Sequence, residues 1–344
     1  MIRTPKATIA SAAEIPDVVQ LDSNLFAAAF RLMKLLPARY ILERARATGR
    51  LTASTTVIET SSGTFGLALA MICALKGYSL YVVGDIAIDA RLKRRLEDLG
   101  TRVVIVPKPA SVGGFQAARL ERVRELQQQF ADHFTPDQYG NPENPGSYAP
   151  VAELLVETLG SIDCVVGTVG SGGSTCGVAR FLRLLFPHLY LVGVDTHGSV
   201  IFGMEDRSRP LRGLGNSLLP ENVRHTVFDE VHWVGAAEAF RATHELHTSR
   251  AMFMGGTSGA AYLVARWWAR DHPDATVVCL LPDEGYRYQD TVYNTRWLNE
   301  NHLLLETLPL QPTLVEHPDE VADSWSCVLW GRRTRDAVLR QRGR

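Results

Sequence analysis

The 344-residue sequence has little net charge, few cysteines and no long apolar run, and each absence excludes a class of protein. Its 36 basic and 37 acidic residues leave a formal net charge of −1, so no long-range field favours nucleic acid or an anionic membrane. No stretch approaches the apolar run of about 18 residues that crosses a bilayer, and the N-terminus lacks the apolar core of a signal peptide. We expect no nucleic-acid partner and no membrane contact.

The cysteines are scattered rather than paired. Five of them, none in a CxxC motif, are typical of reduced thiols in the cytosol, so we expect a cytoplasmic protein and no metal site. Apolar residues make up 46% of the chain and charged residues 21%, which is ordinary for a globular protein. The length favours two lobes of roughly 150 residues each.

Predicted helices and strands alternate along most of the chain. The first run is helix 38–49, strand 55–59, helix 67–77, strand 79–85, helix 90–100 and strand 101–107. After a Pro-rich stretch at 135–150 the alternation resumes and continues to about residue 285. Such alternation with short turns predicts parallel strands joined by right-handed crossovers. Residues 305–344 lose this rhythm, and we expect a packing or oligomer arm there, or a partly mobile extension.

The most informative motif is the glycine- and hydroxyl-rich loop GTVGSGGSTCG at residues 167–177. A turn from a strand into a helix directs free backbone N–H groups at one point, which favours phosphate. The loop is not a P-loop, because no lysine follows Gly173, and it lacks the dinucleotide fingerprint, because Thr175 occupies a glycine position. We expect a phosphorylated ligand; a simple flexible turn is the alternative for this loop alone.

Two further loops share this character, TSSGTFG at 60–66 and GGTSG at 255–259. Parallel α/β sheets bind ligands beyond the carboxyl ends of their strands, so we expect the three loops to converge on one cleft. With a lysine upstream of a helix, they resemble the fold-type II pyridoxal-phosphate enzymes of the cysteine synthase group over about residues 15–300.

The resemblance implies pyridoxal 5′-phosphate as cofactor and an α/β fold of two doubly wound three-layer lobes, like tryptophan synthase β, with the cofactor cleft between them. We expect a smaller mobile lobe at 34–148 and a larger phosphate-binding lobe at 1–33 and 149–304, followed by the extension at 305–344. The resemblance also implies small amino-acid substrates, and we expect a homodimer.

The resemblance assigns the cofactor contacts residue by residue. Lys34 stands where the family has the lysine that holds the cofactor as a Schiff base, which requires an amine made neutral by a lowered pKa. Thr257 stands where a hydroxyl faces the pyridine nitrogen, which favours elimination and replacement over transamination; a helix N-cap is the alternative for Thr257. Thr64 replaces the usual Asn at the cofactor's 3′-oxygen. The phosphate loop is Gly170, Ser171, Gly172, Gly173 and Ser174.

Substrate contacts follow from the same resemblance. The match to the loop that binds the substrate α-carboxylate comprises Ser61, Ser62, Gly63 and Thr64. It opens a predicted helix, where an anion is favoured. Gln138 matches a glutamine that helps to hold the same carboxylate. Arg119 and Tyr139 match positions that face the phosphate leaving group and the second substrate; the alternative for Arg119 is a solvated helix face.

The segments DTHGSVIFG, LRGLGNSLLPE and LLPDEGYRYQDTVYNTRWL resemble one branch of the family. That branch makes N-(2-amino-2-carboxyethyl)-L-glutamate from O-phospho-L-serine and L-glutamate, a 2,3-diaminopropionate precursor in siderophore and peptide antibiotic pathways. The resemblance implies β-replacement on an activated serine, O-phospho-L-serine or O-acetylserine, through an aminoacrylate intermediate. An amine such as L-glutamate is the nucleophile, and Lys34 is the general base.

Three other functions stay open. The first is cysteine synthase-like replacement with sulfide or another nucleophile. The second is a non-catalytic cofactor-binding paralogue, because Thr64 and the segment FAAAFRLM before Lys34, with Leu35 and Leu36 after it, depart from the family pattern. The third is a nucleotide-dependent oxidoreductase, in which Asp195 at a strand end would bind ribose.

Overall fold

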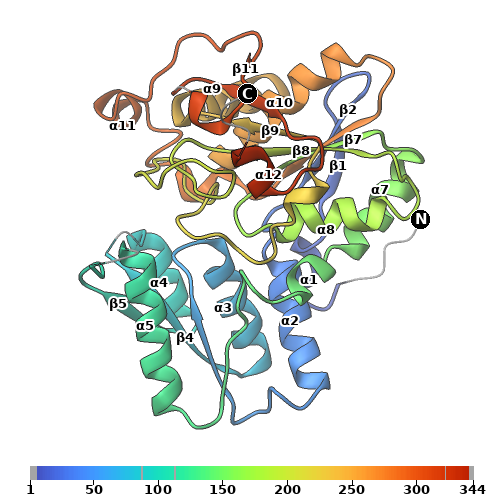
Figure 1. Cartoon of the computed structure of the whole chain (residues 1–344). Helices are drawn as coiled ribbons and strands as arrows, with labels where there is room; N and C mark the ends of the chain where they lie inside the picture. The colour runs from blue at the N-terminus through green and yellow to red at the C-terminus, as the bar shows by residue number, and fades with distance from the viewer. Residues whose placement is uncertain (1–5, 87, 112–113, 322, 341–344) are drawn as a thin grey trace. The chain divides into compact units, whose positions relative to one another are not determined.

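The computed structural model describes residues 6–86, 88–111, 114–321 and 323–340 (Figure 1). The chain divides into two compact units: unit 1 is Met1–Glu14 with Leu32–Ser147, and unit 2 is Ile15–Arg31 with Tyr148–Arg344. Each unit is built on a sheet with parallel strands joined through helices, so the predicted α/β class is confirmed. The outer ends of the expected lobes, residues 1–5 and 341–344, lie outside the described residues.

Unit 1 holds one sheet, which has four parallel strands among the described residues, in the order β5-β4-β3-β6. The strands are β3 (Thr56–Thr60), β4 (Ser79–Asp85), β5 (Arg102–Val106) and β6 (His133–Phe134). The helices are α1 (Ile9–Ala13), α2 (Leu35–Ala47), α3 (Thr64–Lys76), α4 (Ala90–Asp98), α5 (Gly114–Gln129) and α6 (Glu143–Gly146). Every residue of β3 is buried, as expected for an inner strand covered on both faces.

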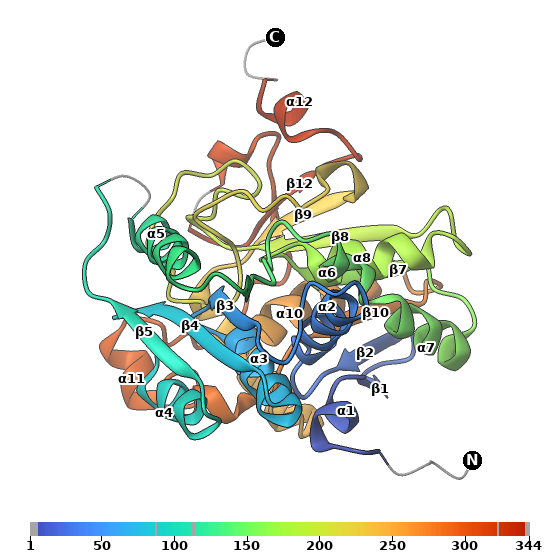
Figure 2. The same ribbon diagram turned by 90° about the horizontal axis from the view of Figure 1, so that it is seen from below.

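Helices cover both faces of the unit 1 sheet, with α3 and α4 on one side and α5 on the other (Figure 2). Val57 of β3 belongs to the apolar cluster that contains Leu69 of α3. Ile58, the next residue, belongs to a second cluster with Val123 and Leu126 of α5. Successive side chains of a strand point to opposite faces, so these two residues tie β3 to both helical layers.

The short helix α1 packs within unit 1. Thr8 caps its first turn by accepting the N–H of Ser11. Glu14 pairs with Arg39 of α2 at 2.6 Å, and Ala10 and Ala13 lie in the same apolar cluster as α2. Residues 6–14 therefore group with residues 32–147. The expected larger lobe had included residues 1–33.

Unit 2 holds a mixed sheet, which has eight strands in the part of the chain that the structure describes, in the order β1-β2-β10-β7-β8-β9-β12-β11. The strands are β1 (Asp17–Gln20), β2 (Leu25–Ala29), β7 (Cys164–Thr168), β8 (Tyr190–Asp195), β9 (Glu230–Trp233), β10 (Val277–Leu281), β11 (Thr313–Leu314) and β12 (Ser326–Leu329). The helices are α7 (Ala149–Leu159), α8 (Gly173–Leu182), α9 (Ala236–Arg250), α10 (Gly256–Asp271), α11 (Thr295–Glu300) and α12 (Arg335–Leu339). No helix of the described residues has both the length and the apolar character to cross a bilayer.

The outer strands of this sheet lie in segments where the sequence showed no alternation of predicted helices and strands. β2 pairs in parallel with β10, and β1 folds back on β2 as an antiparallel hairpin. At the other edge β12 pairs antiparallel with β9, and β11 pairs in parallel with the outer side of β12. Residues 313–314 and 326–329 of the expected extension are therefore strands of the main sheet.

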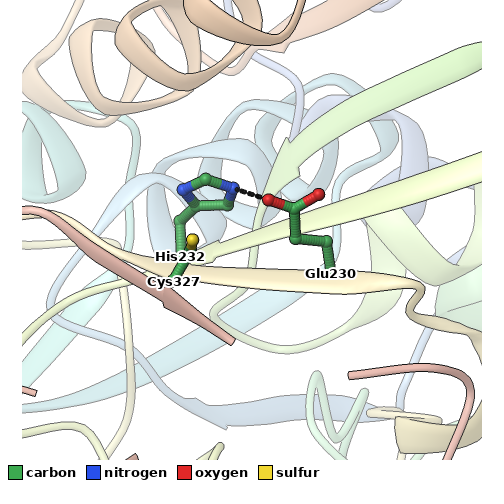
Figure 3. Close-up of side chains that lie close together, drawn as sticks. All are labelled: Glu230, His232 and Cys327. Atoms are coloured by element: carbon green, nitrogen blue, oxygen red, sulfur yellow. Dashed lines mark hydrogen bonds and ion pairs between the residues drawn. The ribbon is translucent and has the colours of Figure 1, made fainter. Parts of the chain in front are cut away.

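A buried hydrogen-bonded chain links Trp325, just before β12, to β9; Figure 3 shows its His232–Glu230 part, with Cys327 nearby. Trp325 Nε1 donates to His232 Nδ1 at 3.0 Å, and His232 Nε2 contacts Glu230 Oε1 at 2.8 Å. Because the indole nitrogen can only donate, Nδ1 accepts, and the ring proton on Nε2 is donated to Glu230. Cys327 lies opposite His232 in the strand register. The C-terminal segment thus adds polar as well as apolar contacts to the core.

We expect Trp325→Phe to lower the free energy of unfolding by about 1–3 kcal/mol, because the buried Nδ1 of His232 would lose its donor. Chemical denaturation measures the change. Trp297→Phe, which replaces a half-buried indole on α11 with a smaller ring, is the control and should lower the free energy of unfolding by less. Equal losses in the two variants would show that the hydrogen bond contributes nothing beyond aromatic packing.

Candidate functional site

In unit 1, the loop between β3 and α3 is shaped by Ser61. Its Oγ accepts the N–H of Gly66 at 2.9 Å and that of Gly63 at 3.3 Å. A side chain at Gly66 would lie 3.1 Å from Ser61 Cβ, so the two residues are in close contact. The Ser61 hydroxyl is therefore used inside the turn. Ser62 and Thr64 are partly exposed, and α3 begins at Thr64 without a side-chain cap on Gly63, which leaves early helix N–H groups for an anion.

The structure brings Arg119 to this loop. Arg119 Nη1 donates to Ser62 Oγ at 3.2 Å and pairs with Asp85 Oδ2, at the end of β4, at 3.1 Å. The side chains of Arg119 and Asp85 are only 13% and 8% exposed, so Arg119 is not on a solvated helix face. Its Nε is buried and makes no hydrogen bond among the described residues. A fixed cation beside the loop is suited to a doubly charged anion.

Gln138 and Tyr139 lie in the segment after β6. Asp137 turns the chain with a positive φ of 51° and accepts the N–H of Gly140 at 3.0 Å. Asn144 Nδ2 donates to the Gln138 carbonyl at 2.6 Å, which holds the backbone of the buried Gln138 in place. Both predicted residues are therefore carried by a turn with its own hydrogen bonds.

Lys34 occupies the N-cap position of α2, with helical dihedral angles, and its carbonyl accepts the N–H of Ala38 at 3.1 Å. The side chain is half-buried. Leu35 and Leu36, which depart from the family pattern, are almost fully buried. Leu35 belongs to the apolar core cluster of unit 1, which accounts for an apolar side chain directly after Lys34.

One residue of this unit was missed by the sequence analysis. Glu59 of β3 is 3% exposed, and burial raises the pKa of its carboxyl group to about 8. Its Oε1 accepts the N–H of Thr60 at 2.8 Å, while Oε2 has no hydrogen-bond partner among the described residues. The available signal was an acidic residue inside the otherwise apolar strand that leads into a predicted loop.

In unit 2, the glycine loop joins β7 to α8. Gly172 is the N-cap of α8, with a φ of 80° and no side-chain cap. A Cβ at this position would lie 2.6 Å from the carbonyl oxygen of Asn222, so only glycine fits. Thr175 Oγ1 donates to the carbonyl of Thr168 at 2.7 Å, which closes the turn on the strand. The uncapped helix start, reached through glycines, fits a phosphate group.

Gly213 connects the glycine loop with Thr257. A side chain at Gly170 would lie 3.1 Å from the carbonyl oxygen of Gly213, and a side chain at Gly213 would meet Thr257 Cγ2 at 3.6 Å. Gly215 donates to the carbonyl of Val169 at 3.0 Å. Thr257 is buried and lies inside α10, whose N-cap is Gly255, so the N-cap alternative for Thr257 is wrong. The glycine loop and Thr257, the two parts of unit 2 that are predicted to bind the cofactor, therefore both contact Gly213.

Asp195 does not suit a ribose. It is fully buried at the end of β8, where Oδ1 accepts the N–H of Thr196 at 2.8 Å. A side chain at Gly215 would lie 3.0 Å from the same Oδ1, so the backbone at Gly215 packs closely against the carboxyl group. Burial raises its pKa to about 7, because backbone and Ser199 hydrogen bonds offset only part of the lost hydration.

Glu230, His232 and Cys327 offer three ligand atoms within 4.8 Å of one another. Metal binding through His232 would have to break a hydrogen bond at either ring nitrogen, because Nδ1 accepts from Trp325 and Nε2 donates to Glu230. The geometry of the described residues therefore fits a structural hydrogen-bonded chain better than a metal centre.

Comparisons with known proteins agree on one family. A sequence profile described as pyridoxal-phosphate dependent enzyme matches residues 30–283. N-(2-amino-2-carboxyethyl)-L-glutamate synthases from Cupriavidus metallidurans and Ralstonia nicotianae are each 37% identical over 268 residues, which cover 76% of this chain and 79% and 78% of theirs. A solved structure, the O-acetylserine dependent cystathionine beta-synthase from Helicobacter pylori, matches with a TM-score of 0.77 and 25% identity, over 84% of this chain and 99% of that chain.

The buried Asp195 makes stability depend on pH. Its pKa in the folded protein is raised from 3.8 to about 7, so the stability contributed by the protonated carboxyl is fully present below 3.8 and is lost as the pH rises through about 7. We expect Asp195→Asn to flatten the fall in unfolding free energy over that range, as measured by denaturation at several pH values. Asp271→Asn, at an exposed site, is the control; matching slopes in wild type and Asp195→Asn would contradict the assignment.

Proposed function

Because this chain belongs to the family of pyridoxal-phosphate dependent enzymes, we propose that it replaces the β-substituent of an activated serine with an amine. It is an enzyme of the cysteine synthase type. The proposed substrates are O-phospho-L-serine, with O-acetylserine as the alternative, and L-glutamate, and the product is a precursor of 2,3-diaminopropionate. The observation that carries this choice is the 37% identity with two N-(2-amino-2-carboxyethyl)-L-glutamate synthases over 268 residues.

Lys34 and unit 2 supply the cofactor contacts in this proposal. The backbone N–H groups of Gly170–Ser174 bind the phosphate of pyridoxal phosphate, and the uncapped start of α8 supports this role. Thr257 faces the ring nitrogen, Thr64 the 3′-oxygen, and Lys34 holds the cofactor covalently. When bound, the cofactor withdraws electrons from the substrate's Cα and so makes its proton acidic.

Unit 1 positions the substrate. The loop Ser62–Thr64, with Gln138, binds the α-carboxylate through the N–H groups of Ser62 and Thr64. Ser61 holds the turn in shape by accepting the N–H groups of Gly63 and Gly66. With the carboxylate fixed, the Nζ of Lys34 removes the Cα proton as general base. Because a neutral threonine hydroxyl keeps the ring nitrogen unprotonated, elimination and replacement are favoured over transamination.

Arg119 supports a phosphorylated substrate. The phosphate leaving group carries more negative charge than acetate. The contacts of Arg119 with Ser62 and Asp85 hold its guanidinium beside the loop at 60–66, which is proposed to bind the substrate carboxylate. We place the leaving phosphate against Arg119 and Tyr139. Asp85 orients the guanidinium and does not itself touch the substrate.

The Lys34→Ala variant should lose the visible absorbance band of the covalently bound cofactor, because no other group is proposed to form the bond. Absorbance spectra of the purified proteins saturated with pyridoxal phosphate measure this loss. Lys76→Ala, which removes an exposed lysine at the end of α3, should keep the band. A wild-type spectrum without any such band would overturn the proposed function.

The Arg119→Met variant should raise KM for O-phospho-L-serine by roughly tenfold to a hundredfold, because a hydrogen bond to a charged group contributes about 1.5–3 kcal/mol. KM for O-acetylserine should change less. Arg119→Lys keeps the charge and should recover part of the loss, and Arg122→Met on the same helix is the matched control. Equal losses for the two substrates would argue that Arg119 acts only on the fold of the loop.

A further inference from the structure

The two parts of unit 1 that are proposed to hold the substrate carboxylate come from distant segments of the chain. One is the loop at 60–66, directly after β3, and the other is the turn that carries Gln138, after β6. Among the described residues, the parallel pairing of β3 with β6 ends at Val57 and Phe134. The backbone that reaches Gln138 therefore lies beyond the paired strands, and other contacts must keep it beside the end of β3.

Glu59, the last but one residue of β3, faces both parts. Its Oε1 accepts the N–H of Thr60, where the loop begins, at 2.8 Å. Burial raises the pKa of this carboxyl group to about 8; the N–H groups of Thr60, Gln138 and Asp137 oppose the rise, and the charge of Asp137 adds to it. The N–H groups of the turn are thus directed at the carboxyl group. Because Glu59 is only 3% exposed, water does not replace these contacts.

The backbone of Gln138 is held on both sides. Its carbonyl accepts from Asn144 Nδ2 at 2.6 Å, and its N–H faces Glu59. The preceding residue, Asp137, has a φ of 51°, a conformation that is uncommon for a residue with a side chain and persists only where the surroundings fix it. The carboxyl group of Glu59 is part of those surroundings. The orientation of Gln138 therefore depends on a residue of β3.

The carboxyl group of Glu59 suits a supporting role and not a contact with substrate. Its Oε2 is buried, and strand alternation places the side chain on the face of β3 that carries Val57, away from α5. With a pKa of about 8, the group is largely protonated at neutral pH. An acidic residue can then lie behind a carboxylate site without repelling the anion.

We propose that Glu59 is a positioning residue for the first substrate: its buried carboxyl group fixes the turn at Gln138 against the loop at 60–66, so that both reach one α-carboxylate. The inference rests on the proposed function and deepens it, because the carboxylate contacts are assigned there. Glu59 itself touches neither substrate nor cofactor. Its loss should weaken binding of the substrate carboxylate and leave the cofactor's absorbance unchanged.

The test is steady-state kinetics of the holoenzyme and its variants. Glu59→Leu removes the acceptor and should raise KM for O-phospho-L-serine by about tenfold, the worth of one hydrogen bond. KM for L-glutamate and the visible band of the bound cofactor should change little. Glu59→Gln keeps one acceptor oxygen and should recover part of the loss. Equal KM values for O-phospho-L-serine in Glu59→Leu and wild type would overturn the proposal.

A double-mutant cycle tests the link to Gln138. If Glu59 acts through that residue, Glu59→Leu should add little to the rise in KM that Gln138→Ala causes, whereas independent effects would multiply. Val57→Ala is the matched control, because this fully buried residue lies on the same face of β3 and its truncation loosens packing alone. A rise in KM in Val57→Ala as large as that in Glu59→Leu would show general loosening and overturn the positioning role.

Amide hydrogen exchange of the wild-type protein keeps the test decisive where Glu59→Leu fails to fold. The N–H of Gln138 should exchange slowly although it lies outside the paired strands, and exchange as fast as in an exposed loop would contradict its contact with Glu59. The outcomes also separate the two proposals. If wild type converts O-phospho-L-serine but Glu59→Leu keeps its KM, only the role of Glu59 is wrong. If wild type converts no activated serine, the proposed function itself is overturned.

Discussion

The close approach of two backbones at Gly172 is the constraint on which the candidate phosphate site depends. A Cβ there would lie 2.6 Å from the Asn222 carbonyl oxygen, and the φ of 80° is itself unfavourable for other residues. The glycine lets α8 begin at Gly173 with no side-chain cap at Gly172, although the N–H of Gly173 reaches Ser171 Oγ at 3.4 Å. Gly213 contacts both Gly170, whose Cβ would lie 3.1 Å from the Gly213 carbonyl oxygen, and Thr257, at an ordinary contact distance of 3.6 Å. At this loop, glycine lets the main chain pass close to its neighbours, so that its N–H groups can be directed at one anion.

The sequence predicted the elements that have strong local signals and missed those that depend on distant partners. The strands before the loops at 60–66 and 167–177 were predicted because apolar runs end in glycine and hydroxyl residues. β2 was missed, because the short, alanine-rich segment 25–29 becomes a strand only by pairing with β10, some 250 positions later. β12 was missed for the same reason: its partner is β9, and its anchor is the hydrogen bond from Trp325 to His232.

The role of a side chain could be predicted from the sequence where local backbone geometry determines it. It could not be predicted where contacts with distant residues determine it. The glycine loop is recognisable from its composition alone. Arg119, by contrast, sits in a charged helical stretch that is typical of a solvated face, and only its contacts with Asp85 and Ser62 give it another role. Glu59 and Asp195 have raised pKa values because the fold removes water from them, which no local pattern reveals.

Two arginines of α5 differ in how the fold holds them. Arg119 is held by Asp85 and is mostly buried, so its orientation is fixed before an anion arrives. Arg124, five residues later, is exposed and lines an open pocket. A leaving group must be stabilised at one defined point, which requires a preorganised cation. Of the two, only Arg119 therefore has the fixed orientation that its proposed role at the leaving group requires.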